Sequence, residues 1–196
     1  RNIHDILKVM TIKGEVAIKK GMMNMKAFVH KGDKYEYVTN YEVREVGRND
    51  VKVALRAAGV NRRDLYIQQR RKGERQPLVL GSDGAGVIVE VGQNVTKWEV
   101  GESVIINPSL RWFDKSDVPP ETFDILGMPD DGTFGEYIVI DEEQIEPILS
   151  HLTWEENASI ALAGRKGYRA LVKKGNIQQG ETVLIPGGSS GVATFM

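Results

Sequence analysis

The chain has 196 residues with 26 basic and 27 acidic side chains, so its net charge of −1 lacks the basic excess typical of nucleic-acid-binding domains. Hydrophobic residues make up 41%, enough to bury a core, and no apolar run is long enough to span a membrane. Cysteine is absent, which excludes disulfides, thiolate zinc sites and a cysteine nucleophile, and fits a cytoplasmic location.

Residues 1–24 mix apolar and basic side chains without a clear period and lack the apolar core of a signal peptide. We expect residues 1–24 to be a leader segment, or translated sequence upstream of a true start at Met25. The alternative is a short helix or strand that packs on the domain.

From Met25 onward, short stretches rich in β-branched residues alternate with Gly, Asn and Asp, a pattern typical of strands joined by turns. The segment 50–58 alternates most clearly, with Val51 and Leu55 on one side and Lys52 on the other, and is expected to be half-buried. The expected strands are Met25–His30, Tyr35–Val46, Asp50–Ala58, Gly84–Val91, Glu102–Asn107, Thr133–Asp141 and Gln144–Ile148. They predict a small closed or nearly closed β-barrel over residues 25–150.

Two segments interrupt these strands. Asn61 can cap a short helix from about Arg62 to Arg71. Residues 108–132 form a long polar loop with four prolines, which we expect to be a surface or active-site excursion.

After residue 150 the pattern becomes helical. Thr153 and Glu156 form a capping box, and helix-favouring residues continue to Lys174. The segment Glu181–Ile185 is an expected buried strand, and it leads directly into the glycine turn Gly187–Ala193. Strand, glycine turn and opening helix make the first unit of a dinucleotide-binding α/β fold.

The glycines of this turn are candidates for cofactor binding. Gly187, Gly188 and Gly191 would let the backbone approach a pyrophosphate at a helix N-terminus. A purely structural glycine turn is the alternative, and the acidic or basic residue that would choose between NAD and NADP is missing.

Taken in order, several segments resemble the medium-chain dehydrogenase/reductase superfamily, in particular its zinc-free, quinone-oxidoreductase-like branch. The resemblance covers Met25 to Met196 and rests on MKAF, AAGVNRRDLY, LGSDGAGVIVEVG, VGESVIINP, ILGMPDDGTFGEYIVI, LTWEENASIALAG, GYRAL and GETVLI. It implies a mainly β fold: a GroES-like barrel (25–150) with the substrate site, then linker helices and the truncated start of a Rossmann domain (151–196). A full member binds a nicotinamide cofactor, NADP or NAD.

The resemblance also indicates that no metal is used. In zinc-dependent members a cysteine stands at the position of Asn61, and a His-Glu pair stands at Ser82 and Asp83. Zinc prefers thiolate and imidazole ligands. The histidines show no ligand spacing; they are His4, His30 and His151.

By the same resemblance, Asn61 and Tyr66 match an Asn-x-x-Asp-x-Tyr stretch that lines the pocket beside the nicotinamide. Amide and phenol groups can donate hydrogen bonds to a carbonyl in place of a metal, which suits a quinone, an enone or a related carbonyl. Asp64 is expected to be structural. Ser82 and Asp83 are candidates for the substrate pocket, with a strand-entry turn as the alternative.

One departure concerns Arg165 and Lys166, which replace a Leu-Thr pair of the family pattern. No cofactor role is assigned to Lys166, and both charges can be solvated.

Hydride transfer needs both reactants held in near-contact. One strand and one glycine turn of a cofactor domain cannot hold a nicotinamide in this way. We therefore expect a fragment or shortened gene product of an NAD(P)H-dependent oxidoreductase, with little or no activity of its own. One alternative is a non-catalytic binding or assembly module, in which the exposed edge of Glu181–Ile185 leads to a homodimer. Another is a decayed gene product that folds and does nothing.

Overall fold

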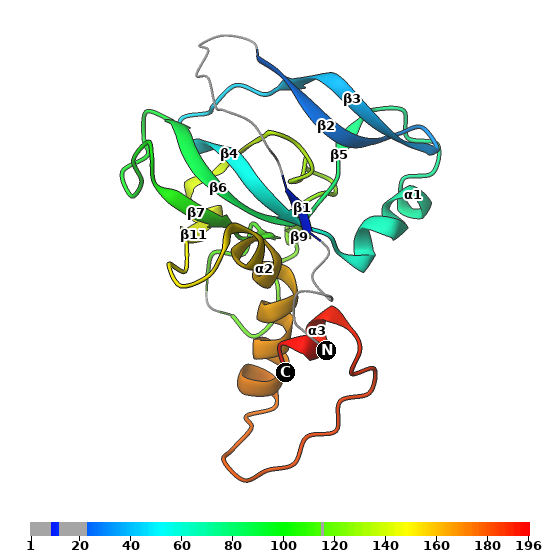
Figure 1. The fold of residues 1–196 in the computed structure, drawn as a ribbon, viewed down its shortest axis with the longest axis vertical. Coiled ribbons are helices and arrows are strands. Elements are labelled where there is room, and N and C mark those ends of the chain that lie inside the picture. The colour runs from blue at the N-terminus through cyan, green and yellow to red at the C-terminus, as the bar shows by residue number, and fades with distance from the viewer. Residues whose placement is uncertain (1–8, 12–22, 115) are drawn as a thin grey trace.

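The computed structural model describes residues 9–11, 23–114 and 116–196, and shows a barrel of strands from which a helical arm leads down to the C-terminus (Figure 1). The strands are β1 (Val9–Thr11), β2 (Met23–Lys31), β3 (Lys34–Val43), β4 (Asp50–Gly59), β5 (Leu78–Val79), β6 (Asp83–Val91), β7 (Ser103–Ile106), β8 (Ser109–Leu110), β9 (Asp124–Ile125), β10 (Tyr137–Asp141) and β11 (Ile145–Pro147). The helices are the 3-10 helices η2 (Arg62–Tyr66) and η3 (Glu142–Gln144), the α-helices α1 (Ile67–Arg70), α2 (Trp154–Tyr168) and α3 (Gly191–Thr194), and the π-helix η4 (Arg169–Lys174).

Two sheets make up the barrel. The larger has the order β1-β4-β6-β7-β11, with β10 also pairing with β4, and the smaller has the order β3-β2-β5. The sheets meet where Ala27 bridges Gly135 and where the Phe28 N–H donates to the Phe134 carbonyl at 2.8 Å. The mainly β fold class predicted from the sequence is confirmed.

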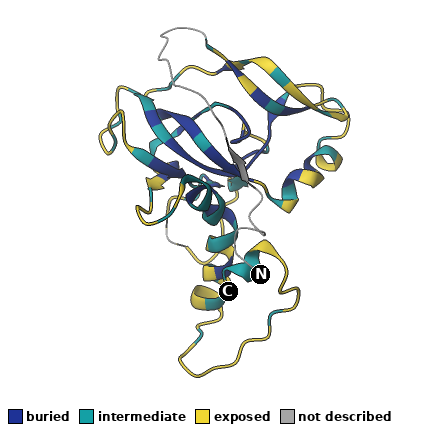
Figure 2. Ribbon diagram, in the orientation of Figure 1, coloured by how far each residue is buried: buried dark blue, intermediate teal, exposed yellow. Residues whose placement is uncertain are grey.

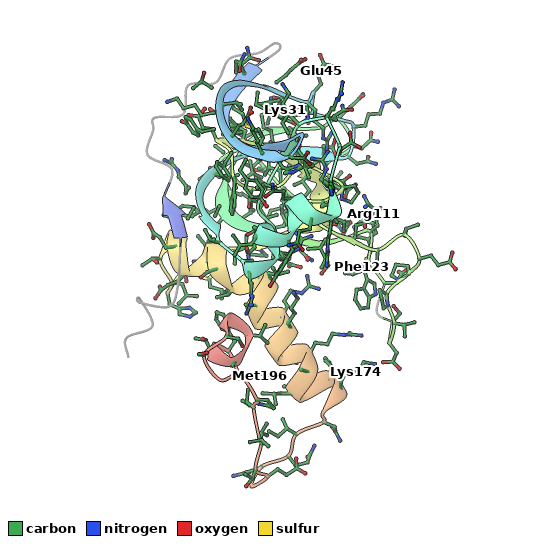
Figure 3. All side chains as sticks on the ribbon, turned by 90° about the vertical axis from the view of Figure 1, so that its right-hand side faces the viewer. Lys31, Glu45, Arg111, Phe123, Lys174 and Met196 are labelled. Atoms are coloured by element: carbon green, nitrogen blue, oxygen red, sulfur yellow. The ribbon has the colours of Figure 1, made fainter. Side chains whose placement is uncertain are left out.

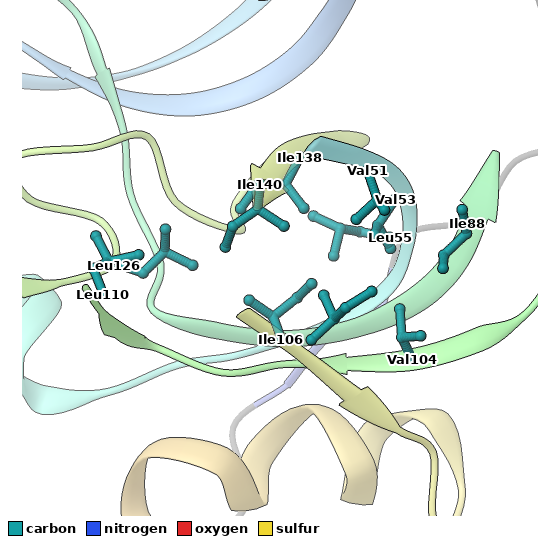
Figure 4. Packing of buried hydrophobic residues seen from close by; sticks show 11 residues of the cluster. Val51, Val53, Leu55, Ile88, Val104, Ile106, Leu110, Leu126, Ile138 and Ile140 are labelled. Atoms are coloured by element: carbon teal, nitrogen blue, oxygen red, sulfur yellow. The ribbon is translucent and has the colours of Figure 1, made fainter. Parts of the chain in front are cut away.

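Aliphatic side chains from both ends of the barrel sequence fill its interior (Figure 4). The members of this cluster are Val51, Val53, Leu55, Ile88, Val104, Ile106, Leu110, Leu126, Ile138, Ile140 and Ile145. Each such side chain contributes about 1.5–3 kcal/mol when it is fully buried. A second cluster, which includes Val29 and Phe134, lies between β2, β5 and the segment before β10. The barrel therefore has a core of its own.

The expectation that β4 is half-buried is wrong. Both faces of β4 are covered, because α2 packs over the side that faces away from the barrel interior. Lys52 is only 8% exposed and forms an ion pair with Glu90, its direct cross-strand neighbour on β6. The alternation in the sequence was real, but the covering helix comes from a distant part of the chain.

The helix α2 begins as predicted. Thr153 Oγ1 accepts from the Glu156 N–H (3.2 Å), and Glu156 Oε2 accepts from the Thr153 N–H (2.9 Å), so the capping box is confirmed. Its small Ala158 side chain packs against Ala57 and Ala85 of the sheet. Small residues at this contact let α2 approach the barrel closely.

The segment 108–132 is more ordered than a plain loop. Its ends pair as the short hairpin β8–β9, in which Ser109 lies opposite Ile125. Arg111 donates to Asp124 and Asp130 and holds the segment closed.

The arm beyond α2 contradicts one prediction. Residues 181–185 form no strand, and Leu184 is 88% exposed, because no described strand lies beside this segment to pair with it. The glycine turn and the short helix α3 do form, and α3 packs on α2. The described residues therefore lack the exposed strand edge at 181–185 through which a homodimer was expected to form. The homodimer itself stays a prediction. Figure 2 shows the exposed character of this arm.

Of residues 1–24, the structure describes 9–11 and 23–24. Val9–Thr11 pair with Ala57–Gly59 as strand β1, which is the alternative reading, and Met23 begins β2. The remaining residues of the expected leader lie outside the described part. Within that part, no helix combines the length and apolar character needed to cross a membrane.

Candidate active site

The candidate site begins where α2 crosses the barrel. Asp83, the first residue of β6, is fully buried. Its Oδ1 accepts from Asn61 Nδ2 (2.7 Å), and its Oδ2 accepts from the Leu162 N–H on α2 (3.0 Å). Gly59 leaves room for this arrangement, because a Cβ there would lie 2.6 Å from Asp83 Oδ1 and 2.8 Å from the Ala158 carbonyl oxygen. One carboxyl thus joins the loop at Asn61 to the helix.

The charge of Asp83 is sensitive to pH near neutrality. Burial raises its pKa to about 7, although the hydrogen bonds from Leu162 and Asn61 act in the opposite direction. The nearby carboxyl of Asp64 adds to the upward shift of the pKa. Asp83 therefore gains or loses a proton in the physiological range.

The side-chain NH2 group of Asn61 donates two hydrogen bonds. Besides the bond to Asp83, Nδ2 donates to the Gly59 carbonyl at 3.3 Å. The Asn61 backbone N–H donates to Asp64 Oδ2 (2.8 Å), and the Asp64 N–H donates to the Asn61 carbonyl (3.0 Å). Asp64 holds this turn, as expected of a structural residue, and burial raises its pKa to about 6. The longer bond to Gly59 is the weaker of the two amide bonds.

Tyr66 lies at the other end of the five-residue helix η2 from Asn61. It is 41% exposed, and its hydroxyl oxygen accepts from Arg62 Nε at 3.3 Å. The Tyr66 hydroxyl group makes no other hydrogen bond with the described part of the chain. Tyr66 can therefore donate to a ligand from the surface of the barrel.

Ser82 lies deeper. It is fully buried, donates to the Leu126 carbonyl (2.8 Å) and accepts from Arg63 Nη1. Arg63 also donates to the carbonyls of Leu126 (2.6 Å) and Ile125 (3.5 Å). Ser82 and Asp83 are thus bonded within the protein, and their contact with substrate stays a prediction. The sequence did not indicate Arg63, because its partners are distant main-chain carbonyls that no local pattern identifies.

A cavity of about 1430 Å³ opens beside these residues, between the segment 105–125 and the helices α2 and η4. Figure 3 places Phe123 on one side of this region and Lys174 toward the lower end of the arm. The predicted residues Asn61, Tyr66, Ser82 and Asp83 are not among its described lining residues. Asp83 is linked to the cavity wall by the hydrogen bond from the Leu162 N–H, and Ser82 is linked to it through Arg63, which donates to the Ile125 carbonyl.

Lys166 on α2 lines the same cavity. Partial burial of its amino group and the nearby charge of Arg63 lower the pKa of Lys166, while Asp83 acts to raise it. Lys166 is exposed as a whole residue, and its charge interacts with that of Asp83.

The side chains of Asn61, Ser82 and Asp83 do not fit a zinc ion. Zinc prefers thiolate and imidazole ligands, and here the positions hold an amide, a hydroxyl and one carboxyl. Both carboxyl oxygens of Asp83 already accept N–H hydrogen bonds. Across the described residues, no cluster of three His, Cys, Asp or Glu side chains is placed to hold a metal.

The glycine turn fits the approach of an anion from one side. Gly187 has a φ of +78°, which favours glycine, and a Cβ at this position would meet no atom within 4 Å. The Ser190 N–H donates to the Gly187 carbonyl (2.9 Å), and Ser190 Oγ accepts from the Ala193 N–H (3.2 Å). Gly187, Gly188 and Gly191 therefore leave open space beside the main chain at the start of α3.

Comparison with known proteins identifies the family. Residues 47–150, more than half of the chain, match the alcohol dehydrogenase GroES-like domain. The chain belongs to this family. The predicted membership of the medium-chain dehydrogenase/reductase superfamily is confirmed, because relatives and solved structures of this GroES-like domain are dehydrogenases and reductases.

Three similar proteins illustrate the range. A zinc-type alcohol dehydrogenase-like protein of Schizosaccharomyces pombe is 34% identical over 163 residues, which cover 79% of this chain and 46% of the relative. The crotonyl-CoA carboxylase/reductase of Cereibacter sphaeroides is 29% identical, covering 79% of this chain and 39% of the relative. The crystal structure of an NAD-dependent alcohol dehydrogenase superposes with a TM-score of 0.72 at 30% identity, covering 80% and 49%. The chain thus spans less than half the length of these two curated relatives.

Proposed function

We propose that this chain forms the substrate side of an NAD(P)H-dependent oxidoreductase that reduces a quinone, an enone or a related carbonyl without zinc. Residues 25–150 would be the substrate domain, and residues 151–196 the linker helices and the start of the cofactor domain. The observation that carries the proposal is the Asn61–Asp83 hydrogen bond, which fixes a neutral donor where zinc-dependent relatives of this fold place metal ligands.

Reduction of a carbonyl by hydride transfer requires that negative charge on the substrate oxygen be stabilised. A bound nicotinamide would supply the hydride. Asn61 can share with the substrate oxygen, without turning, the amide hydrogen that makes the weak 3.3 Å bond to Gly59, while its other amide hydrogen keeps the bond to Asp83. Such fixed donors stabilise developing charge at little reorganisation cost.

Tyr66 would supply a second donor. Its oxygen accepts from Arg62 Nε, and an accepted hydrogen bond from a cation polarises the phenol and strengthens its own donation. Hydrogen-bond donors at the carbonyl oxygen are most useful for conjugated carbonyls. Hydride addition to the β-carbon of such a compound places negative charge on its carbonyl oxygen. The conjugated thioester named in the crotonyl-CoA relative supports this substrate class.

The nucleotide would be held at the other end of the chain. Gly187, Gly188 and Gly191 are the residues that would lie against its diphosphate, because they leave the main chain open there. Either NAD or NADP is compatible with these glycines.

The proposal can be tested by binding, without turnover. Ligand-observed NMR titration should show that 2-cyclohexen-1-one binds this chain more tightly than cyclohexanone. Tyr66→Phe and Asn61→Ala should each weaken binding of the enone, because each removes a donor, and EDTA should have no effect. Tyr37→Phe is the matched control, since Tyr37 is 61% exposed on β3. Equal binding of the two ketones, enone binding unchanged in both variants, or loss of binding in EDTA would contradict the proposal.

A further inference from the structure

The cavity beside α2 has two chemically different walls. The helical wall carries basic side chains, which are Arg165, Lys166, Arg169, Lys173 and Lys174. The opposite wall carries the aromatic rings of Trp112, Phe113 and Phe123 together with Ile125. Four carboxylates also line the cavity, those of Asp114, Asp117, Glu143 and Glu146, and Glu143 is paired with Lys97. A ligand that fits both walls needs a charged end and an apolar face.

Two of the basic side chains at the outer end of the cavity already have partners. Lys174 forms an ion pair with Asp117 at 3.2 Å. The Arg169 guanidinium lies 4.8 Å from the ring centre of Trp112 and donates to the Asp117 carbonyl oxygen at 2.7 Å. These contacts fasten the segment around residue 117 to η4.

The inner pair of cations is less compensated. Arg165 donates to the neutral side-chain oxygen of Asn107, and the carboxylate that acts on its charge is Glu146, with which it forms no described ion pair. Lys166 makes no ion pair with a described residue, and the carboxyl that acts on it, Asp83, is only partly ionised at neutral pH. Arg63 adds further positive charge from behind the wall. The inner end therefore favours an anion.

Partial burial strengthens this preference. Both residues are exposed as a whole, but partial burial of their charged ends lowers the pKa of Arg165 and of Lys166. An ion pair formed in such a place is stronger than one on an open surface, because the effective dielectric constant is lower.

The aromatic wall is suited to a planar group. Trp112 and Phe123 are half-buried and pack edge to face, with ring centres 5.4 Å apart. Trp112 Nε1 donates to Ser116 Oγ (2.8 Å), which fixes the indole. Rings held in this way offer apolar area without needing to be ordered on binding.

We propose that this cavity binds a planar, conjugated carboxylate, with its carboxylate held by Arg165 and Lys166 and its plane packed against Phe123. This inference deepens the proposed function, because it makes the substrate an unsaturated acid or a carbonyl compound that carries an acid group. The alternative source of such an anion is an adenosine phosphate group of the cofactor, which has a planar ring and a charge as well.

The test uses the whole chain and three redox-inert probes in the absence of cofactor: trans-cinnamate, its neutral isostere trans-cinnamamide, and adenosine 2′,5′-bisphosphate. Isothermal titration calorimetry should show that cinnamate binds about tenfold more tightly than cinnamamide, the effect expected of one charge-assisted hydrogen bond. Equal affinity of these two probes, or no binding of either, overturns the proposal. Binding of the bisphosphate without cinnamate overturns the assignment to a carboxylate.

Variants locate the site. Lys166→Met and Arg165→Met should each bring the affinity for cinnamate close to that for cinnamamide and leave cinnamamide unchanged, while Lys166→Arg should keep the preference. Lys34→Met, on the exposed strand β3, is the control for lost charge. Cinnamate binding that is unaffected by both methionine variants overturns the proposal. Because no hydride is transferred in these titrations, failure of the proposed reduction would leave their outcome unchanged.

Discussion

The barrel and the arm that follows it differ in how their residues are stabilised. In the barrel, the strands of the larger sheet bury a continuous aliphatic cluster, and Ile88 and Val104 are fully buried (Figure 4). In the arm, η4 contains no buried residue and residues 181–185 pair with no described strand (Figure 2). Groups on the barrel are therefore held in place by its own core, whereas the glycine turn depends on the contact between α3 and α2.

The largest expected effect contrasts one aliphatic residue from each region. Ile88→Ala should lower the free energy of unfolding by about 2–5 kcal/mol, because it leaves a cavity in the barrel core. Leu184→Ala should change it by less than about 0.5 kcal/mol, because Leu184 is 88% exposed. Urea unfolding followed by circular dichroism checks both. Similar losses in the two variants would show that the arm has a packed core of its own.

A second prediction concerns the pH dependence of stability. Folding raises the pKa of Asp83 from 3.8 to about 7, so the folded state holds a proton that the unfolded chain has released. The stabilisation is fully present below about pH 4 and is lost as the pH rises toward 7, by a few kcal/mol. Asp83→Asn should remove most of this loss, and the residual dependence should come from Asp64, which shifts in the same direction.

Urea unfolding at pH 5 and at pH 8 measures this difference in both proteins. If the free energy of unfolding falls equally between the two pH values in the parent and in Asp83→Asn, the buried carboxyl is not its source.

The third prediction tests the close approach of α2 to the barrel. Gly59→Ala should destabilise the fold by about 1–3 kcal/mol, because the added Cβ would lie within 3 Å of Asp83 Oδ1 and of the Ala158 carbonyl. Gly188→Ala is the matched control in the arm, since its Cβ would meet only the Ile185 carbonyl oxygen at 3.9 Å. In thermal unfolding, Gly59→Ala should melt at a lower temperature than Gly188→Ala. Equal melting temperatures would mean that α2 lies farther from β4 than described.

The smallest effect is expected at the glycine turn. NADPH should bind this chain with a Kd above about 1 mM, because an exposed turn with no described strand behind it offers only solvent-competed hydrogen bonds to a diphosphate. Titration of nicotinamide fluorescence measures this binding. Saturable binding in the micromolar range would show that the arm forms a complete nucleotide site by itself.

Local patterns predicted most elements, and the misses share a physical cause. The capping box of α2 and the strands of the barrel depend on residues close in sequence, so their spacing was sufficient. The burial of Lys52, the bonds from Arg63 to distant carbonyls and the link between Asp83 and Leu162 all depend on segments that meet only in the folded chain. The segment 181–185 has the composition of a strand but lacks a described partner, and a strand forms only when another strand pairs with it.

We propose above that neutral hydrogen-bond donors on the barrel, Asn61 and Tyr66, polarise the substrate carbonyl. The most direct measurement is the C=O stretching frequency of 2-cyclohexen-1-one bound to this chain, isolated by isotope-edited infrared difference spectroscopy. We expect a frequency well below that in an apolar solvent, and we expect it to rise toward the apolar value when Asn61→Ala and Tyr66→Phe are combined. An identical frequency in the parent and in the double variant would contradict it.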